Sequence, residues 1–284
     1  MRPYRILVMN RLPSEHPEPC WLAIRLPHLA LDLYTRGQQG RENMLAVSAL
    51  VERRERIIDC NPAAMAGGVK PGMPVPAAHA ILGGLHVAKR DEAAERAALE
   101  RLAAWCSQYS SQVCVPGDRA GLMLEAGASR RLFGRPAELA QRLQRELGQL
   151  GYHALAGSAP TPEAAWLGAD EGLHIDAQGR IRRQLGAMPL QRLHLDTARI
   201  EAMGRMGFRQ LRDLLRLPRK DLTRRFGPGL PDYLDRLLGI LPDPRPCYRP
   251  PEAFSSRLEL PAEIHACQAL LFPLKRLLGE LCGV

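Results

Sequence analysis

Short apolar runs with alternating character recur through the first half of the chain. Such runs predict β-strands, here over Cys20–Leu26, Met44–Ser48, Arg56–Cys60, Val113–Val115, Gly121–Ala126 and His153–Ser158. Between them, stretches with an apolar stripe predict helices over Leu29–Tyr34, Asp91–Ser107, Arg135–Leu150 and Pro162–Ala169. The order β-α-β-β-α-β is typical of a ferredoxin-like α+β unit, here with a module inserted after its first strand.

The C-terminal part of the chain has a different pattern. Leu190–Leu241 is leucine-rich, and glycine-containing turns divide it into short helices that are typical of helix-hairpin-helix units. A proline-rich linker follows at Leu241–Glu252. Beyond it we expect a strand over Phe254–Leu260 and a helix over Ala262–Leu281, whose leucines would form one buried face.

Length and composition favour a soluble protein of about two domains. The chain has 284 residues, 46% of them hydrophobic, which is ample for a core. Its N-terminal apolar run is interrupted by Arg11 and is too short for a membrane span or a signal peptide, so we expect a cytoplasmic protein. The 7 cysteines include no C-x-x-C pair and the histidines lack metal-ligand spacing, which argues against a disulfide framework and a zinc site.

The positive charge of the chain is concentrated in one segment. The formal net charge is +9. Residues 180–249 contain 16 Lys and Arg against 7 Asp and Glu, and the rest of the chain is balanced. Such a block is typical of polyanion binding. A solvated, arginine-rich surface would produce the same count, and charge alone leaves both interpretations open.

Four motifs, taken in order, resemble those of the Y-family (translesion) DNA polymerases. GGVKPGMPVPAA (Gly67–Ala78) is similar to the family's fingers pattern, and SRRLFG (Ser129–Gly134) is similar to the end of its second palm motif. APTPEAAWLGA (Ala159–Ala169) is similar to the small-residue helix after a palm strand, and LPRKDLTRRFG (Leu217–Gly227) is similar to the thumb. The order and spacing of the motifs carry the resemblance, which covers the chain from Cys20 onward.

The resemblance implies a fold class and a division of the chain. The fold would be α+β, with a ferredoxin-like palm, an inserted fingers module, a helical thumb and a truncated α/β little finger. After an N-terminal extension at 1–19, we expect the palm at 20–32 and 89–188, the fingers at 33–88, the thumb at 189–241, the linker at 242–253 and an incomplete little finger at 254–284. An incomplete little finger would leave a sheet edge unpaired, so we expect a fragment of a longer protein.

The family's catalytic carboxylates have no counterparts at the matching positions. Y-family chemistry uses two Mg²⁺ ions, held by an Asp of the first palm strand and an Asp-Glu pair of a later one. Those positions fall on Ala23 and on Ala120 and Gly121. The second match has a slack of about two residues because it lies at a turn. Asp118 can therefore be placed in the Asp position, which puts Arg119 in the Glu position.

Other residues indicate the same loss of chemistry. Arg25 lies two residues after Ala23, on the same face of its strand, and Glu125 would lie too far along its own strand to substitute. The Tyr and Arg with which the family holds the nucleotide correspond to Pro62 and Met65. We therefore expect no catalytic residue, no nucleotide-binding residue, no metal and no cofactor.

The thumb is the remaining candidate for nucleic-acid binding. Turn amides at Gly207 and Gly229, each with the helix N-terminus that follows, would hold a DNA phosphate. Basic side chains nearby would add affinity without reading sequence, namely Arg209, Arg212, Arg219, Lys220, Arg224 and Arg225. The alternative is an ordinary compact helical subdomain.

Within the Y-family, the missing acids and the segment RLPHLALD resemble the inactive ImuB-type subgroup of the bacterial mutasome. This implies a non-catalytic adaptor in SOS-induced translesion synthesis and mutagenesis that binds DNA. Its further partners would be the sliding clamp, a DnaE-type error-prone polymerase and a RecA-like ImuA-type protein, bound mostly through regions beyond this chain. Two alternatives stay open, namely a divergent but active polymerase that uses Asp118 and a protein-interaction scaffold without DNA binding.

Overall fold

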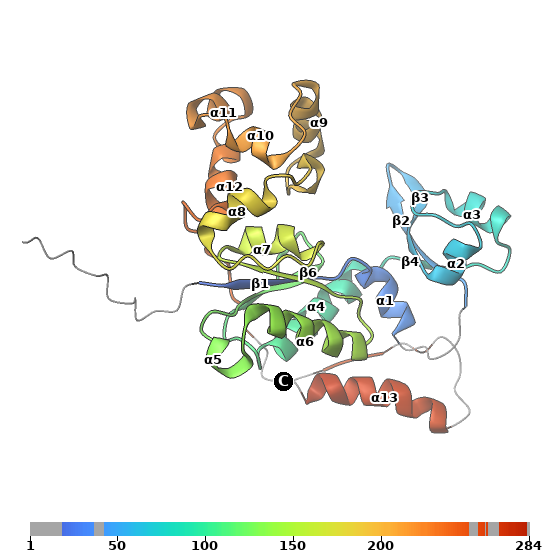
Figure 1. Ribbon diagram of the computed structural model, residues 1–284. Helices are drawn as coiled ribbons and strands as arrows, with labels where there is room; N and C mark the ends of the chain where they lie inside the picture. The colour runs from blue at the N-terminus through green and yellow to red at the C-terminus, as the bar shows by residue number, and fades with distance from the viewer. Residues whose placement is uncertain (1–18, 37–42, 250–254, 259, 261–266, 283–284) are drawn as a thin grey trace, which may run out of the picture.

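The computed structural model describes residues 19–36, 43–249, 255–258, 260 and 267–282 (Figure 1). At its centre is a four-stranded sheet with the order β5-β6-β1-β7. The strands are β1 (Trp21–Arg25), β5 (Val113–Cys114), β6 (Gly121–Glu125) and β7 (Leu155–Ala159). β1 pairs antiparallel with both β6 and β7. Strands that are far apart in the sequence thus become neighbours around β1.

The two faces of this sheet are covered by different helices, because successive side chains of a strand point to opposite sides. Leu22 and Ile24 of β1 pack in one core with α4 (Glu92–Cys106) and α6 (Pro136–Gln149). Ala23 lies in a second core with α7 (Pro162–Ala169). In Figure 1, α7 lies above the sheet, and α4 and α6 lie below it. We call the four strands with α4, α6 and α7 the central module.

The helices of the central module begin at capping residues. The side chain of Asp91 accepts a hydrogen bond from the Ala93 N–H at 3.0 Å, before α4. Thr161 accepts one from the Ala164 N–H at 3.2 Å, before α7. Each such cap stabilises a helix by about 1 kcal/mol. After α6, the chain turns at Gly151, which has a φ of 86°. Glycine adopts this conformation without the steric cost that a side chain would add.

A second, smaller sheet forms the three-stranded module. Its order is β3-β2-β4, from β2 (Leu45–Val51), β3 (Arg54–Cys60) and β4 (His86–Lys89). Its two helices are α2 (Pro62–Ala66) and α3 (Val75–Ile81). The helix α1 (Leu29–Thr35) comes before this module in the chain and contacts β2 and β3.

Short helices form a third part of the molecule, above the Ala23 face of the central sheet (Figure 1). A short helix, α5 (Arg130–Phe133), precedes α6. Beyond α7, the chain continues through α8 (Gln178–Leu185) and the 3₁₀ turn η1 (Leu190–Arg192). The helices that follow are α9 (Thr197–Arg205), α10 (Leu211–Leu215), α11 (Arg219–Phe226) and α12 (Gly229–Leu237). We call α9 to α12 the helical module.

The last helix, α13 (Cys267–Leu281), packs beside α4. Its buried side carries Glu280, which is 1% exposed and forms an ion pair with the buried Arg36. The stripe of Leu271, Leu274 and Leu278 therefore faces outward, with 63%, 49% and 49% exposure. The expectation that the leucines of this helix form one buried face is wrong, because the charge pair determines which side is buried.

The structure confirms the α+β fold class and most of the predicted elements to within about two residues, the usual uncertainty of an element boundary. The strand predicted over Phe254–Leu260 is an exception, because its described residues 255–258 and 260 are not in a strand. Phe254, Glu259, residues 262–266 of the predicted last helix and residues 1–18 of the predicted extension lie outside the described residues. None of the helices in the described ranges is long and apolar enough to cross a membrane.

Candidate functional site

Of the positions predicted for metal-binding acids, Ala23 and Gly121 lie on the face of the central sheet that α7 covers, and the exposed Ala120 directly precedes β6. Ala23 of β1 pairs with Met123 of β6, and Arg25 pairs with Gly121. The carbonyl of Ala120 accepts a hydrogen bond from the Leu26 N–H at 3.0 Å. The structure thus places these positions on or directly before two adjacent strands, and none of Ala23, Arg25, Ala120 and Gly121 carries a carboxylate.

Trp166 of α7 lies between two arginines at this junction. The guanidinium carbon of Arg25 is 5.3 Å from the ring centroid of Trp166, and that of Arg119 is 5.2 Å from it. Guanidinium groups are attracted to the face of an indole ring at such distances. We call Arg25, Trp166 and Arg119 the arginine–tryptophan stack.

Each arginine of the stack has a carboxylate partner in α7 or directly after it. Arg25 forms an ion pair with Asp170, which Arg192 also approaches at 3.2 Å. Arg119 donates to both oxygens of Glu163, at 2.9 and 3.3 Å. The acids at this site are therefore already neutralised by guanidinium groups that lie on the same face of the sheet.

Glu163 connects three parts of the molecule. It is 2% exposed and accepts hydrogen bonds from Arg119, from the Tyr233 hydroxyl of α12 at 2.9 Å and from Arg245 at 3.4 Å. Burial raises the pKa of Tyr233 well above its ordinary value, and the charge of Glu163 raises it further, so this phenol stays a donor. A single buried carboxylate thus holds the central module, the helical module and the segment after α12 together.

Gly121 has no room for a side chain. A Cβ atom there would lie 2.2 Å from the Ile24 carbonyl oxygen and 2.9 Å from the Trp166 ring. Both distances are shorter than non-bonded atoms adopt, so a glutamate at this position requires the strand and the indole to move. The arginine–tryptophan stack occupies the space that such a carboxylate would need.

The acids considered as substitutes are engaged elsewhere. Asp118 lies before β6, is 61% exposed at its side chain, and forms a hydrogen bond with His194. Burial acts to raise the pKa of Asp118, but the hydrogen bond and charge of His194 and the charge of Arg119 outweigh it, so the pKa is lowered. Glu125 accepts hydrogen bonds from the N–H groups of Cys20 and Gly127, at 3.2 and 2.9 Å. Among the described residues, no group of three or more His, Cys, Asp or Glu side chains could hold a metal ion.

The nucleotide-grip positions lie in the three-stranded module. Pro62 is the first residue of α2, after the cap Asn61, and Met65 is 49% exposed. Neither side chain can donate a hydrogen bond to a phosphate.

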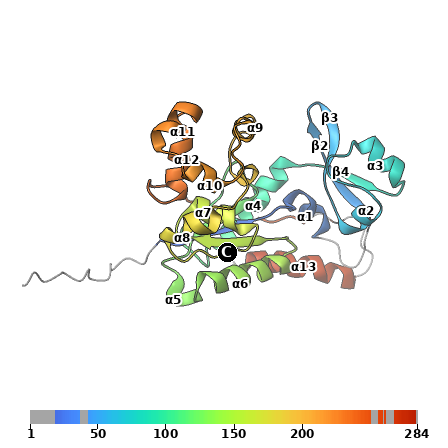
Figure 2. The same ribbon diagram turned by 45° about the horizontal axis from the view of Figure 1, so that its top comes forward.

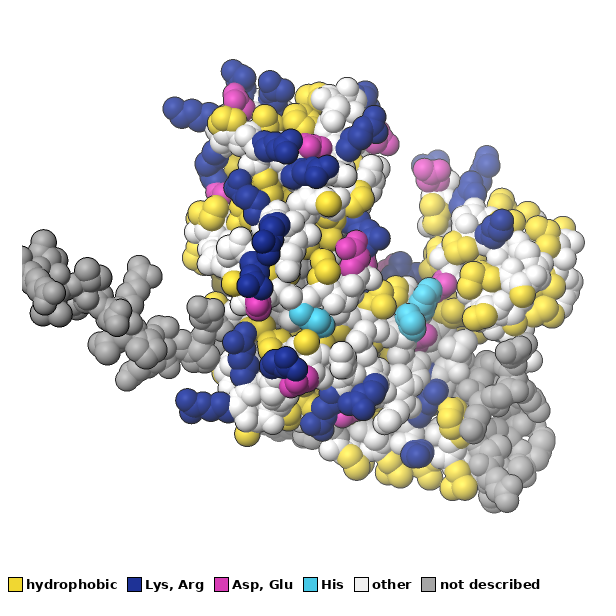
Figure 3. Space-filling model, viewed as in Figure 1, with side chains coloured by type: hydrophobic (Ala, Val, Ile, Leu, Met, Phe, Trp, Pro, Cys, Tyr) yellow, Lys and Arg dark blue, Asp and Glu magenta, His cyan; other side chains and the backbone are white. Residues whose placement is uncertain are grey.

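The basic residues of the helical module are exposed. All six predicted side chains are in this class, namely Arg209, Arg212, Arg219, Lys220, Arg224 and Arg225. Figure 3 shows Lys and Arg side chains spread over this part of the surface. Within the described residues, ion pairs are found for Arg219, with Asp232 and Asp235, and for Arg224, with Asp221. The other four form no ion pair with another described residue.

The two predicted turn glycines have different conformations. Gly207 lies between α9 and α10 with a φ of 87°. The corresponding residue between α11 and α12 is Gly227, with a φ of 79°, whereas Gly229 is the first residue of α12. The predicted turn between α11 and α12 is thus present, with Gly227 as its left-handed residue, and the amide of Gly229 lies at the start of α12.

Sequence reasoning missed Glu163, Asp170, Tyr233 and Arg245. The available signal was a glutamate within the otherwise small and apolar segment PEAAWLGA, which predicts a buried helix. A buried charge requires a partner of opposite sign. The candidate partners were Arg25, noted on the same strand face as Ala23, and Arg119, placed in the Glu position.

Comparisons with known proteins give the relatives of this chain. Residues 37–170 match the IMS family, described as the impB/mucB/samB family. Protein ImuB of Caulobacter vibrioides, strain NA1000 / CB15N, is 32% identical over 218 residues, which are 76% of this chain and 47% of that protein. Protein ImuB of the strain ATCC 19089 matches with the same values. The chain thus spans about half the length of the curated relatives it matches.

Solved structures match the fold. The crystal structure of DinB from Sulfolobus solfataricus has a TM-score of 0.61 and 18% identity, over 80% of this chain and 69% of that one. The post-insertion binary complex of Dbh DNA polymerase has a TM-score of 0.64 and 16% identity, with the same coverage. Residues 37–170 of this chain therefore belong to the impB/mucB/samB family, in a molecule with the fold of the Y-family DNA polymerases.

Proposed function

We propose that this protein is a non-catalytic Y-family-like adaptor in bacterial DNA-damage-induced translesion synthesis, which binds DNA and helps to place an active error-prone polymerase. The central module would be the palm, the three-stranded module the fingers and the helical module the thumb. The similarity to ImuB supports a role in this process. The fold, shared with Dbh DNA polymerase in a post-insertion binary complex, supports DNA binding.

The arginine–tryptophan stack carries the proposal that the palm is inactive. Phosphoryl transfer to a primer end needs two divalent cations held by converging carboxylates. Here Asp170 and Glu163 pair with Arg25 and Arg119, and the guanidinium charges would repel a metal ion. The steric limit at Gly121 keeps a further carboxylate out.

Primer extension tests the loss of catalysis. The protein is incubated with a primed template, all four nucleotides and either Mg²⁺ or Mn²⁺, next to an active Y-family polymerase as the positive control. We expect no template-dependent incorporation by this protein. Incorporation that disappears in Asp118→Asn would establish the alternative of a divergent polymerase, because it would assign a metal-binding role to that carboxylate.

The exposed arginines of the helical module support DNA binding. Arg209, Arg212, Lys220 and Arg225 form no ion pair within the described residues, so their charges are available to phosphates. Gly207 presents its turn on the same module. Contacts of this kind release counterions from DNA and therefore weaken steeply with salt.

Salt-dependent binding to primer-template DNA tests this part of the proposal. The variant Lys220→Glu/Arg224→Glu/Arg225→Glu is compared with Arg53→Glu/Arg54→Glu/Lys70→Glu, which changes the net charge equally on the exposed surface of the three-stranded module. We expect the first variant to lose at least about ten-fold in affinity and to have a flatter salt dependence, and the second to bind almost normally. Equal losses would show that net charge alone attracts DNA. Absence of binding at low salt would favour a scaffold without a DNA role.

The protein partners are proposed from the resemblance to the ImuB-type subgroup. They are the sliding clamp, a DnaE-type polymerase and a RecA-like ImuA-type protein, reached mostly through regions that the relatives have beyond the matched part. Co-purification of each partner with a full-length relative and with this 284-residue chain tests the assignment. We expect the full-length protein to retain them and this chain to retain them weakly.

A further inference from the structure

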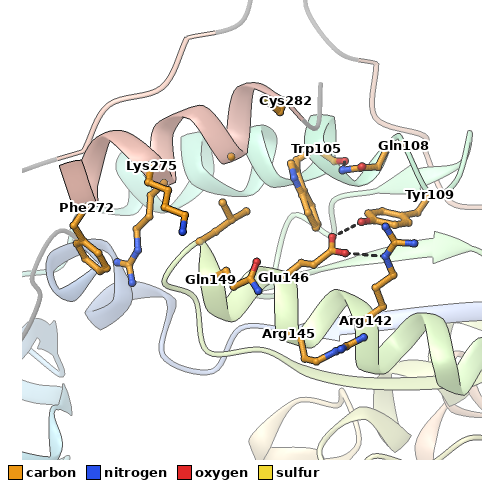
Figure 4. Close-up of a pocket in the computed structure, with 13 residues that line it drawn as sticks. Trp105, Gln108, Tyr109, Arg142, Arg145, Glu146, Gln149, Phe272, Lys275 and Cys282 are labelled. Carbon is orange, nitrogen blue, oxygen red and sulfur yellow. Dashed lines mark hydrogen bonds and ion pairs between the residues drawn. The ribbon is translucent and has the colours of Figure 1, made fainter. Parts of the chain in front are cut away.

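A basic groove lies on the side of the central module away from the helical module. Its walls are α4, α6 and α13, and its volume is about 810 Å³. Figures 1 and 2 both show α13 beside α6, and Figure 4 shows the lining side chains. The buried Trp105 and Leu150 contribute apolar surface to it. We call it the α6–α13 groove, and nothing in the proposed DNA-binding role uses it.

The lining of the groove carries an excess of positive charge. Its ionisable groups include four cations, Arg142, Arg145, Lys275 and Arg276, and one carboxylate, Glu146. That carboxylate already accepts hydrogen bonds from Arg142 at 2.7 Å and from the Tyr109 hydroxyl (Figure 4). Arg145 and Lys275 are exposed and form no ion pair within the described residues.

Arg276 is a half-buried cation with two atoms that lack an acceptor. These atoms, Nε and Nη1, have no hydrogen-bond partner among the described residues, and the guanidinium lies 4.4 Å from the Phe272 ring centroid. Burial lowers the pKa of Arg276 and the charge of Arg36 lowers it further, whereas Tyr152, Asp32 and Glu280 act in the opposite direction. Buried N–H groups without an acceptor cost free energy in the folded state. An anion bound in the groove would add negative charge near this guanidinium.

The shape of the lining favours a carboxylate-bearing peptide over nucleic acid. Bases of single-stranded nucleic acids bind by stacking on open aromatic faces. Trp105 and Tyr109 are only 5% and 2% exposed, and the Phe272 ring is already covered by Arg276. What remains is apolar surface bordered by cations from two helices, which complements a segment with acidic side chains and an apolar anchor.

We propose that the α6–α13 groove is a docking site for an acidic segment of a partner protein. Carboxylates of the segment pair with Arg145 and Lys275 from opposite walls, and an apolar side chain packs above Leu150. The inference is independent of DNA binding and of the loss of catalysis, because it concerns a different face of the molecule.

Peptide selection tests the proposal with the intact chain. Random peptides of about twelve residues, long enough for a typical groove-bound motif, are displayed and selected for binding. They are then counter-selected against Arg145→Glu/Lys275→Glu. We expect the retained peptides to be rich in Asp and Glu with one Leu or Phe. A labelled peptide of the consensus sequence should bind the double variant at least about ten-fold more weakly, since charge reversal replaces attraction with repulsion.

The matched control is Arg54→Glu/Lys70→Glu, which reverses the same number of exposed charges on the three-stranded module and should bind the peptide normally. Thermal unfolding of both variants checks that each is folded. Failure to enrich any peptide, enrichment of peptides without acidic residues, or equal binding by both variants would overturn the proposal. So would a thymidine oligonucleotide that binds in the groove more tightly than the peptide, since it would identify nucleic acid as the ligand.

Discussion

The arginine–tryptophan stack and the helical module both concentrate arginine, but they differ in what neutralises it. Arg119 has a side chain that is 8% exposed and pairs with the buried Glu163. Lys220 and Arg225 are exposed and have no ion pair within the described residues. A desolvated charge must be paired, whereas a solvated one need not be. The buried arginines therefore belong to the architecture, and the exposed ones are available to a partner.

The largest effect should come from breaking the buried pairing. Replacing Glu163 by Gln leaves Arg119 without its counter-charge, and we expect a loss of about 3 to 5 kcal/mol in the free energy of unfolding. Urea denaturation measures it. The control Glu171→Gln affects a carboxylate that is 48% exposed and 3.8 Å from Arg192, and it should cost less than about 1 kcal/mol. Equal losses would show that burial does not distinguish the two pairs.

A buried acid that has no ion pair in the described part of the chain should respond to pH in a specific direction. Asp32 is 8% exposed and accepts a hydrogen bond from the His153 N–H at 2.8 Å. Burial raises its pKa from 3.8 to about 6, so the folded state binds the proton more tightly than the unfolded state. Stability should therefore fall as the pH rises from about 4 to 6 and then level off, by about 2 to 3 kcal/mol in total.

Asp32→Asn should remove this contribution to the pH dependence, because the amide does not titrate and can still accept the same hydrogen bond. Urea denaturation at a series of pH values in the wild type and the variant measures the difference. An unchanged pH profile in the variant would assign the effect to another group.

Adding a side chain at Gly121 should lower the stability of the folded state by a smaller amount. The Cβ atom of Gly121→Ala meets the Ile24 carbonyl and the Trp166 ring, so the strand or the indole must shift. We expect a cost of about 1 to 3 kcal/mol in thermal unfolding. Gly117→Ala is the control, since nothing lies within 4 Å of a Cβ atom there. If Gly121→Ala left stability unchanged, the strand or the Trp166 ring could move at little cost. That result would weaken the steric argument against a metal-binding acid at this position.

The smallest changes in stability should come from replacing two arginines of α11, one paired and one unpaired within the described residues. Arg219 pairs with Asp232 and Asp235, whereas Arg225 has no ion pair within the described residues. Arg219→Ala should lower stability by up to about 1 kcal/mol, and Arg225→Ala should leave it nearly unchanged. In DNA titrations we expect the reverse order, with the larger loss in Arg225→Ala. If both variants lost the same DNA affinity, Arg219 would bind DNA phosphates despite its ion pairs within the protein.

Periodicity predicted much of the fold from the sequence. The alternation in β1 correctly placed Ala23 and Arg25 on one face, and the leucine spacing in α6 predicted the buried Leu139, Leu143 and Leu147. The resemblance to the Y-family motifs identified Ala23, Ala120 and Gly121 as the positions at which this chain has no carboxylate. Five of the six candidate DNA-binding side chains lie on α10 or α11, and Arg209 lies in the turn before α10, but charge counts do not tell which of them are paired.

The partners of the buried charges were decided by tertiary structure. Arg25 pairs with Asp170 across 145 residues and Arg119 with Glu163 across 44, and no local pattern relates such positions. The outward leucines of α13 follow from the same cause, because burying Glu280 against Arg36 determines how that helix rotates. Secondary structure depends on near neighbours in the chain and could be predicted from them. Charge pairing depends on which surfaces meet after packing, and only the folded molecule determines that.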